Sequence, residues 1–260
     1  MRARRPLRRA PVLGWLAGRH SLAAELAALV VLYALYETSR GVVAGDSAGA
    51  VRHARLIASL ERSLHVFCEL HVQDAARTVP GLVGTLGVLY LTLHLTVTGL
   101  YLLWLHRRRP AAFPVVRTAL LTASALALIG FLAFPTAPPR LAALGIADTI
   151  SHGGLDLNHG LVSALYNPYA AVPSMHVCYA GIVGASLCRH GGRAILRVLG
   201  AVYPALQLFV IVATGNHFFF DAATGAGVAA VSLLAASWVT RARPESRGDA
   251  RRLRPLHEFG

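Results

Sequence analysis

The sequence predicts an all-α integral membrane protein, built as a six-helix bundle with an outer interfacial amphipathic helix. Composition is the first reason. Of the 260 residues, 55% are hydrophobic and only 14% are charged, and mean hydropathy is +0.53, which is unlike a soluble domain. Spacing is the second reason, because the apolar residues gather in runs close to the roughly 17–25 residues that a membrane-spanning helix needs.

Six spans are expected, at residues 21–36, 82–105, 118–134, 172–188, 198–213 and 218–240. The first is the weakest because Glu25 interrupts it. No signal-peptide cleavage site follows it, so we interpret it as a retained span. The second is the clearest. Its His94 lies at helical spacing from Tyr90 and Thr98, a polar stripe that we interpret as hydrogen bonding within the bundle. A channel for a lipid head group is the alternative.

Residues 41–79, between the first two spans, predict the amphipathic helix. Side chains recur at helical spacing along one face of it: Ile57, Leu60, Leu64, Phe67 and His71. We expect this helix to lie on the outer interface or against the bundle. The charged residues of segment 61–70 are interpreted as its solvated face.

The distribution of arginine predicts the orientation. All 25 basic residues are arginine, and 19 of them lie in four segments that alternate correctly to share one side: 1–20, 106–117, 188–197 and the tail from 241. The positive-inside rule puts both termini in the cytoplasm. We therefore expect a multi-pass plasma-membrane protein with a basic cytoplasmic N-terminus (1–20), a six-span membrane domain (21–240) and a basic cytoplasmic tail (241–260). Because the arginines flank apolar runs, nucleic-acid binding is not expected.

Three polar clusters fall at the ends of predicted spans. They are FPTAPPR (134–140), NPYAAVPSMH (167–176) and TGNHFFFD (214–221). The predicted topology puts all three on the outer side of the membrane. Separate loops that converge on one membrane face are what a functional site requires, whereas scattered capping residues have no reason to share it.

The side chains of these clusters suit phosphoryl transfer. His217 and Asp221 are one helical turn apart, so the carboxylate can fix the imidazole tautomer and leave the other nitrogen as a nucleophile. His176 suits the general acid that protonates the leaving oxygen. Pro173 begins a helix whose amides and dipole attract anions, and Arg140 offers a fork of donors for phosphate oxygens. This set requires no metal ion and no other cofactor.

Each assignment has a structural alternative. The His217–Asp221 pair could merely stabilise the end of a span, although an ionisable pair this close to the membrane is costly without a function. For His176 the alternative is a role in capping the fourth span. Ser174 alone could cap that helix, so capping does not require the histidine. Arg140 could simply extend to the membrane interface.

Two further groups of residues are not assigned to chemistry. The three cysteines have no metal-ligand spacing, and Cys178 and Cys188 are read as small buried thiols. The polar residues of loop 141–166 fit no zinc pattern, so we interpret that loop as shaping the substrate entrance. They are Asp148, His152, Asp156 and His159.

PSMH and HFFFD resemble the second and third signature motifs of the type 2 phosphatidic acid phosphatase superfamily. In that superfamily the third-motif histidine is the nucleophile, the following aspartate orients it, and the second-motif histidine protonates the leaving group. The resemblance implies these roles for His217, Asp221 and His176. It covers about residues 82–240.

The sequence departs from the better-known branch of that superfamily in two places. The chain contains no lysine for the first motif, and Val210 and Ile211 stand where Ser-Arg is expected. The order FPTAPPR, PSMH, HFFFD is instead similar to the inositol phosphorylceramide synthase branch and its bacterial, inositolphosphotransferase-like relatives. We expect these residues to bind the substrate: Arg140, Ser174, Pro139, Asn216 and Tyr169.

The predicted activity is phosphoryl or head-group phosphate transfer within the membrane. The expected substrate is a lipid or polyprenyl phosphate, diphosphate or phosphodiester, and membrane lipids are the expected surroundings. Water in place of an acceptor alcohol would make the protein a phosphatase, and the residues leave that alternative open. A transporter or an inactive scaffold is the remaining alternative. A transporter would favour broken helices and charges at the membrane midplane, whereas the polar residues here gather at one face. The oligomeric state is not predicted.

Overall fold

The structure is a computed structural model that describes residues 47–149 and 169–241, together with Ala27, Val31 and Ala34. The first predicted span and the basic tail from residue 242 lie outside the described residues, apart from those three positions. The described helices are α3 (Ser47–Ser63), α4 (Glu69–Arg77), α5 (Leu82–Arg108), α6 (Phe113–Ala133), the 3-10 turn η1 (Pro139–Leu141), α8 (Met175–His190), α9 (Ala194–Ala213) and α10 (Phe219–Arg241).

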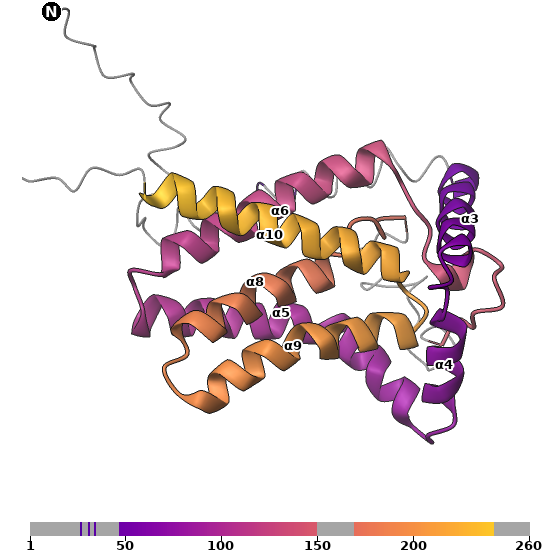
Figure 1. Ribbon diagram of the computed structural model, residues 1–260, viewed down its shortest axis with the longest axis horizontal. Helices are drawn as coiled ribbons and strands as arrows, with labels where there is room; N and C mark the ends of the chain where they lie inside the picture. Colours follow the sequence, from indigo (N-terminus) through magenta and orange to yellow (C-terminus); the bar gives the residue numbers. More distant parts are fainter. Residues whose placement is uncertain (1–26, 28–30, 32–33, 35–46, 150–168, 242–260) are drawn as a thin grey trace, which may run out of the picture.

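Five long helices run side by side, and α3 and α4 lie across one end of them (Figure 1). Small residues allow α8 and α9 to approach closely. A Cβ added at Gly184 would overlap the carbonyl oxygen of Gly200, and one added at Gly200 would crowd the carbonyl oxygen of Gly184. Such contacts between small residues are typical of helices packed within membranes.

Four helices are long and apolar enough to cross a membrane: α5, α6, α9 and α10. With 16 residues, α8 is only about 24 Å long, which is less than the roughly 30 Å of a bilayer core. The prediction of an all-α, multi-pass membrane protein is therefore confirmed, while the described residues supply four spans of the six expected. Many large apolar side chains stay exposed on these helices, Leu100, Ile129, Leu234 and Trp238 among them, as expected of surfaces that face lipid.

The described part of segment 41–79, residues 47–79, differs from the prediction, because it forms two helices, α3 and α4, and not one. The chain turns between them at His65, whose φ is 59°. The expected apolar face is also wrong: Leu60 and Leu64 are exposed. The buried face of α3 consists of Gly49, Ala50, Ala54, Ile57, Ala58 and Glu61, and Ala50 accepts a hydrogen bond from the amide of Ala137 at 3.1 Å.

The interpretation of segment 61–70 as a solvated face is wrong for its two glutamates, since Glu61 is 2% exposed and Glu69 is fully buried. Spacing cannot reveal this. On one straight helix, residues eight positions apart would lie about 12 Å from each other. The turn after α3 instead brings both carboxyl groups to neighbouring backbone amides, those of Phe220 and Phe219.

The helices α5, α8 and α10 finish at the bundle end away from α3 and α4 (Figure 1), and basic residues lie at that end. They occupy the last turns of α5, α8 and α10. The described residues of the predicted polar clusters lie at the other end, where α6 and α9 finish and α8 and α10 begin. The fold thus separates a basic end from the end that carries the candidate site.

Candidate active site

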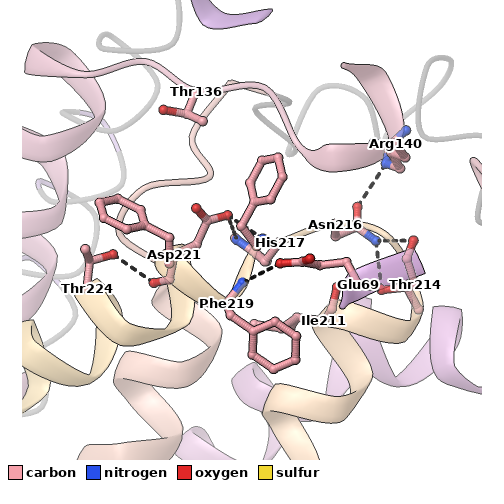
Figure 2. A network of polar contacts seen from close by, with 12 residues as sticks. Glu69, Thr136, Arg140, Ile211, Thr214, Asn216, His217, Phe219, Asp221 and Thr224 are labelled. Carbon is pink, nitrogen blue, oxygen red and sulfur yellow. Dashed lines mark hydrogen bonds and ion pairs between the residues drawn. The ribbon is translucent and has the colours of Figure 1, made fainter. Parts of the chain in front are cut away.

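A linker of five residues between α9 and α10 carries His217. Its Nδ1 lies 3.1 Å from Oδ2 of Asp221, and the same carboxylate oxygen accepts the amide hydrogen of Phe218 at 2.9 Å. Both side chains are buried, with exposures of 5% and 0%. Figure 2 shows the imidazole and the carboxylate facing one another at the start of α10.

The linker turns tightly because its backbone bonds to the end of α9. The amides of Asn216 and His217 both donate to the carbonyl of Ile211, at 3.0 and 3.2 Å. Gly215 has a φ of 70°, and a Cβ there would crowd Ile146, so glycine is required for this turn. His217 consequently precedes α10 and does not lie on it. The expected contact between His217 and Asp221 is present, but the tight turn of the linker produces it, not the spacing of residues along one helix.

His176 lies in the first turn of α8 and faces His217, with ring centroids 5.4 Å apart. Its Nε2 is 3.1 Å from the carbonyl oxygen of Tyr90, and the Tyr90 ring stacks on it at 4.5 Å. His94 packs on another side, at 4.1 Å between centroids. Two residues of the predicted polar stripe of α5, Tyr90 and His94, therefore pack on His176, which the sequence did not indicate.

These partners define which nitrogen of each imidazole can react. The Tyr90 carbonyl can only accept, so Nε2 of His176 carries the hydrogen and Nδ1 is left to exchange a proton. The Asp221 carboxylate likewise accepts from Nδ1 of His217, which leaves the Nε2 lone pair available. The His217–Asp221 pair thus holds a nitrogen suited to nucleophilic attack next to the imidazole of His176.

The backbone that leads into α8 packs directly on α10. The amide of Ser174 donates to the carbonyl of Asp221 at 3.0 Å, and a Cβ at Gly225 would overlap the Ser174 carbonyl. The hydroxyl of Ser174 is fully buried yet makes no hydrogen bond within the described residues, and it does not cap α8. A buried hydroxyl at a helix N-terminus is suited to an anionic ligand.

Arg140 takes part in a buried polar network. Its Nε donates to Oδ1 of Asn216 at 3.0 Å, and one terminal nitrogen pairs with Asp148 at 2.7 Å. Asn216 in turn donates to the hydroxyl of Thr214 at 2.9 Å, as Figure 2 shows. Arg140 and Asn216 therefore support the His217 linker.

The other two predicted substrate-binding residues are Pro139 and Tyr169. Pro139 is buried at the start of η1. Tyr169 is half-buried, and its carbonyl accepts the amide hydrogen of Thr136 at 2.9 Å, which ties the segment before α8 to the segment after α6.

Three buried polar residues near the site were not predicted. Glu61 and Glu69 bind the first turn of α10. Gln73 pairs with the backbone of Ala147, accepting from its amide at 2.7 Å and donating to its carbonyl at 3.0 Å. Nothing in the sequence indicated that these three residues are buried, because a polar residue on an amphipathic helix is normally exposed.

No group of three histidine, cysteine or acidic side chains suited to a metal ion occurs in residues 47–149 and 169–241. Within that part of the chain, the site is made of imidazoles, carboxylates, an arginine, and the start of α8. Loop 150–168, which includes His152, Asp156 and His159, lies outside the described residues.

The fold and the site together define a membrane protein that sets two imidazoles against a helix N-terminus, an arrangement suited to phosphate chemistry. The family model of the PAP2 superfamily, the type 2 phosphatidic acid phosphatases, matches residues 55–235. The chain belongs to this superfamily and is a phosphatase or phosphotransferase enzyme, which confirms the resemblance at the level of the superfamily. Comparison with the curated proteins and with the solved structures gives no significant match.

Proposed function

We propose that the protein is a membrane-embedded phosphotransferase that acts on a lipid-linked phosphate or phosphodiester through a phosphohistidine. The observation that supports this most directly is the His217 Nδ1 to Asp221 contact at 3.1 Å, with the His176 ring 5.4 Å away. A nucleophile, its orienting carboxylate and a second proton-transferring group are the parts that covalent phosphoryl transfer needs.

In the first step, Nε2 of His217 attacks the donor phosphorus. The bond from phosphorus to the leaving oxygen breaks, and Nδ1 of the protonated His176 gives that oxygen its proton. The α8 amides and the hydroxyl of Ser174 stabilise the charge on the phosphoryl oxygens. Asp221 holds the His217 imidazole, which becomes positively charged as the phosphorus–nitrogen bond forms.

In the second step, an acceptor hydroxyl attacks the phosphohistidine. His176 takes its proton, the phosphorus–nitrogen bond breaks, and His217 returns to its starting state. We propose Arg140, Pro139, Asn216 and Tyr169 as the residues that shape the phosphate and head-group site. Of these, Arg140 supplies the positive charge that lysine supplies in other branches.

We propose that an alcohol, as in inositolphosphotransferases, takes the place of water as acceptor. His217 is 4% exposed, and the adjoining Phe218 is fully buried. Surroundings of this kind limit the access of water to a phosphohistidine and favour an acceptor delivered from the membrane. The FPTAPPR segment, which resembles the inositol phosphorylceramide synthase branch, supports the same choice.

We also propose that the site faces the outside of the plasma membrane, with both termini in the cytoplasm. The support is the 19 arginines on the predicted inner side together with the basic last turns of α5, α8 and α10. A reporter fused after residue 260 should be cytoplasmic, and one inserted in loop 141–166 should be external. A cytoplasmic reporter in that loop would reverse the orientation.

The decisive experiment traps the phosphoenzyme. Purified protein is mixed with phosphatidic acid or phosphatidylinositol labelled in the phosphate, and acid-labile label on the protein is measured. Wild type should carry label, His217→Ala none, and Asp221→Asn far less. The exposed His71 on α4 provides a matched control, since His71→Ala should behave as wild type. Normal turnover in a folded His217→Ala variant rules the mechanism out.

The acceptor is tested on the trapped intermediate. Diacylglycerol and ceramide are added in bilayers, and the rate at which label leaves the protein is followed. A transferase releases label faster when a suitable alcohol is present, and the label appears in a new lipid. Release at one rate whatever alcohol is added, with only water-derived product, identifies a phosphatase.

A further inference from the structure

Three successive backbone amides at the start of α10 each donate to a carboxyl group. Phe218 donates to Asp221 at 2.9 Å, Phe219 to Oε1 of Glu69 at 3.0 Å, and Phe220 to Oε1 of Glu61 at 2.7 Å. The first amides of a helix have no partner within it. Here two of them are satisfied by α3 and α4, from about 150 residues earlier in the chain.

Ordinary capping does not explain two glutamates at this position. A serine or asparagine next to the helix satisfies such amides at no electrostatic cost, whereas burying carboxyl groups is expensive. Glu61 is 2% exposed and Glu69 is fully buried. The second oxygen of each makes no hydrogen bond within the described residues. Both groups are therefore held in place for the contact with α10.

The pair carries less charge than two glutamates would carry in water. Burial, and then the neighbouring Glu69 carboxyl, raise the pKa of Glu61 to about 9. Repulsion from Asp221 raises the pKa of Glu61 further, and both glutamates in turn raise the pKa of the neighbouring Cys68 thiol. Near neutral pH, Glu61 is therefore protonated. A neutral Glu61 can stay buried beside Glu69, where a second negative charge could not.

We propose that Glu61 and Glu69 are positioning residues that hold the first turn of α10, and with it Asp221, in the orientation that His217 requires. This inference rests on the proposed function, because it concerns the orientation of Asp221 towards His217. Neither glutamate touches the reacting atoms. Asp221 is the third residue of α10, so movement of that turn displaces its carboxylate relative to the imidazole.

The inference predicts a loss of turnover without a loss of substrate binding. Glu61→Ala and Glu69→Ala should each lower kcat about 10- to 100-fold, since a displacement of about 1 Å at a reacting centre costs on the order of 100-fold. KM should stay within about twofold. Phosphatidic acid and phosphatidylinositol in mixed micelles serve as the probes.

Two variants give the comparison its control. Glu61→Gln keeps an oxygen for the Phe220 amide and imitates the protonated acid, so it should restore most of the turnover lost in Glu61→Ala. Asp74 is an exposed acid on the same helix as Glu69, with its side chain 59% exposed, and Asp74→Ala should match wild type. If both alanine variants behave as Asp74→Ala does, the proposal is wrong.

Hydrogen exchange of the peptide that spans 217–224 provides a readout independent of turnover. The Phe219 and Phe220 amides should exchange at least about tenfold faster in the alanine variants than in Glu61→Gln, because local opening exposes them. Unchanged exchange overturns the positioning role even if activity falls. If wild type turns over neither lipid, the proposed function fails, while faster exchange still shows that the glutamates hold this turn.

Discussion

Replacement of Gly225 by alanine is the most direct test of how the two halves of the site fit together. Gly225 lies one turn after Asp221 on α10, and a Cβ there would overlap the carbonyl oxygen of Ser174 and lie 3.2 Å from its carbonyl carbon. Backbone atoms cannot swing aside as the end of a flexible side chain can. The segment before α8 and the first turns of α10 must therefore move apart.

The size of this movement sets the expected effect. Restoring ordinary contact requires a separation of about 1 Å, which strains the 3.0 Å hydrogen bond from the Ser174 amide to the Asp221 carbonyl. Overpacking of this kind costs about 1–3 kcal/mol. The helix itself favours alanine over glycine by up to about 1 kcal/mol. A shift of about 1 Å between the groups that we propose to be catalytic should lower turnover on the order of 100-fold.

Gly227 provides the matched control, because a Cβ added there meets nothing within 4 Å. It lies on the same helix and gains the same helix propensity. The thermal unfolding midpoint in detergent and kcat on phosphatidic acid should both fall in Gly225→Ala and should both be kept in Gly227→Ala. Equal midpoints and equal kcat values for the two variants would show that α8 and α10 are not in the contact described.

Three other predictions concern stability, pH and metal ions. Gln73→Leu should lower the free energy of unfolding by roughly 2–4 kcal/mol, because it leaves the amide and carbonyl of Ala147 without their partners. A change within about 0.5 kcal/mol, the size of a surface effect, contradicts this. Because the pKa of Glu61 is raised, the folded state binds a proton that the unfolded state has already released. The stability that this proton contributes is complete below about pH 4.5 and is lost as pH rises towards about 9. Unfolding measured across that range should depend less on pH in Glu61→Gln, and equal pH dependence contradicts the assignment. A chelator should leave turnover within about twofold of the untreated rate, since imidazole, arginine and helix amides supply the charge stabilisation that metals otherwise bring. A loss of activity that Mg²⁺ or Zn²⁺ restores would contradict this prediction.

The sequence by itself determined the class of protein and its superfamily. Long apolar runs can only be buried in lipid or in a large core, so hydropathy identified α5, α6, α9 and α10 before any packing was known. His217 and Asp221 are only four residues apart, and a contact of such short range depends on one turn of chain. The motif resemblance pointed to the superfamily for the same reason, since PSMH and HFFFD are local patterns.

Only the tertiary structure decided what surrounds those motifs. Glu61 and Glu69 look like exposed charges in the sequence, and they are buried because the break after α3 carries them to amides about 150 residues away. His94 looks like a polar residue of one helix, and it packs on His176 because α5 and α8 are neighbours. Hydropathy and helical spacing describe one segment at a time. Burial of a polar group depends on whether another segment brings it a partner, and that partner exists only once the chain has folded.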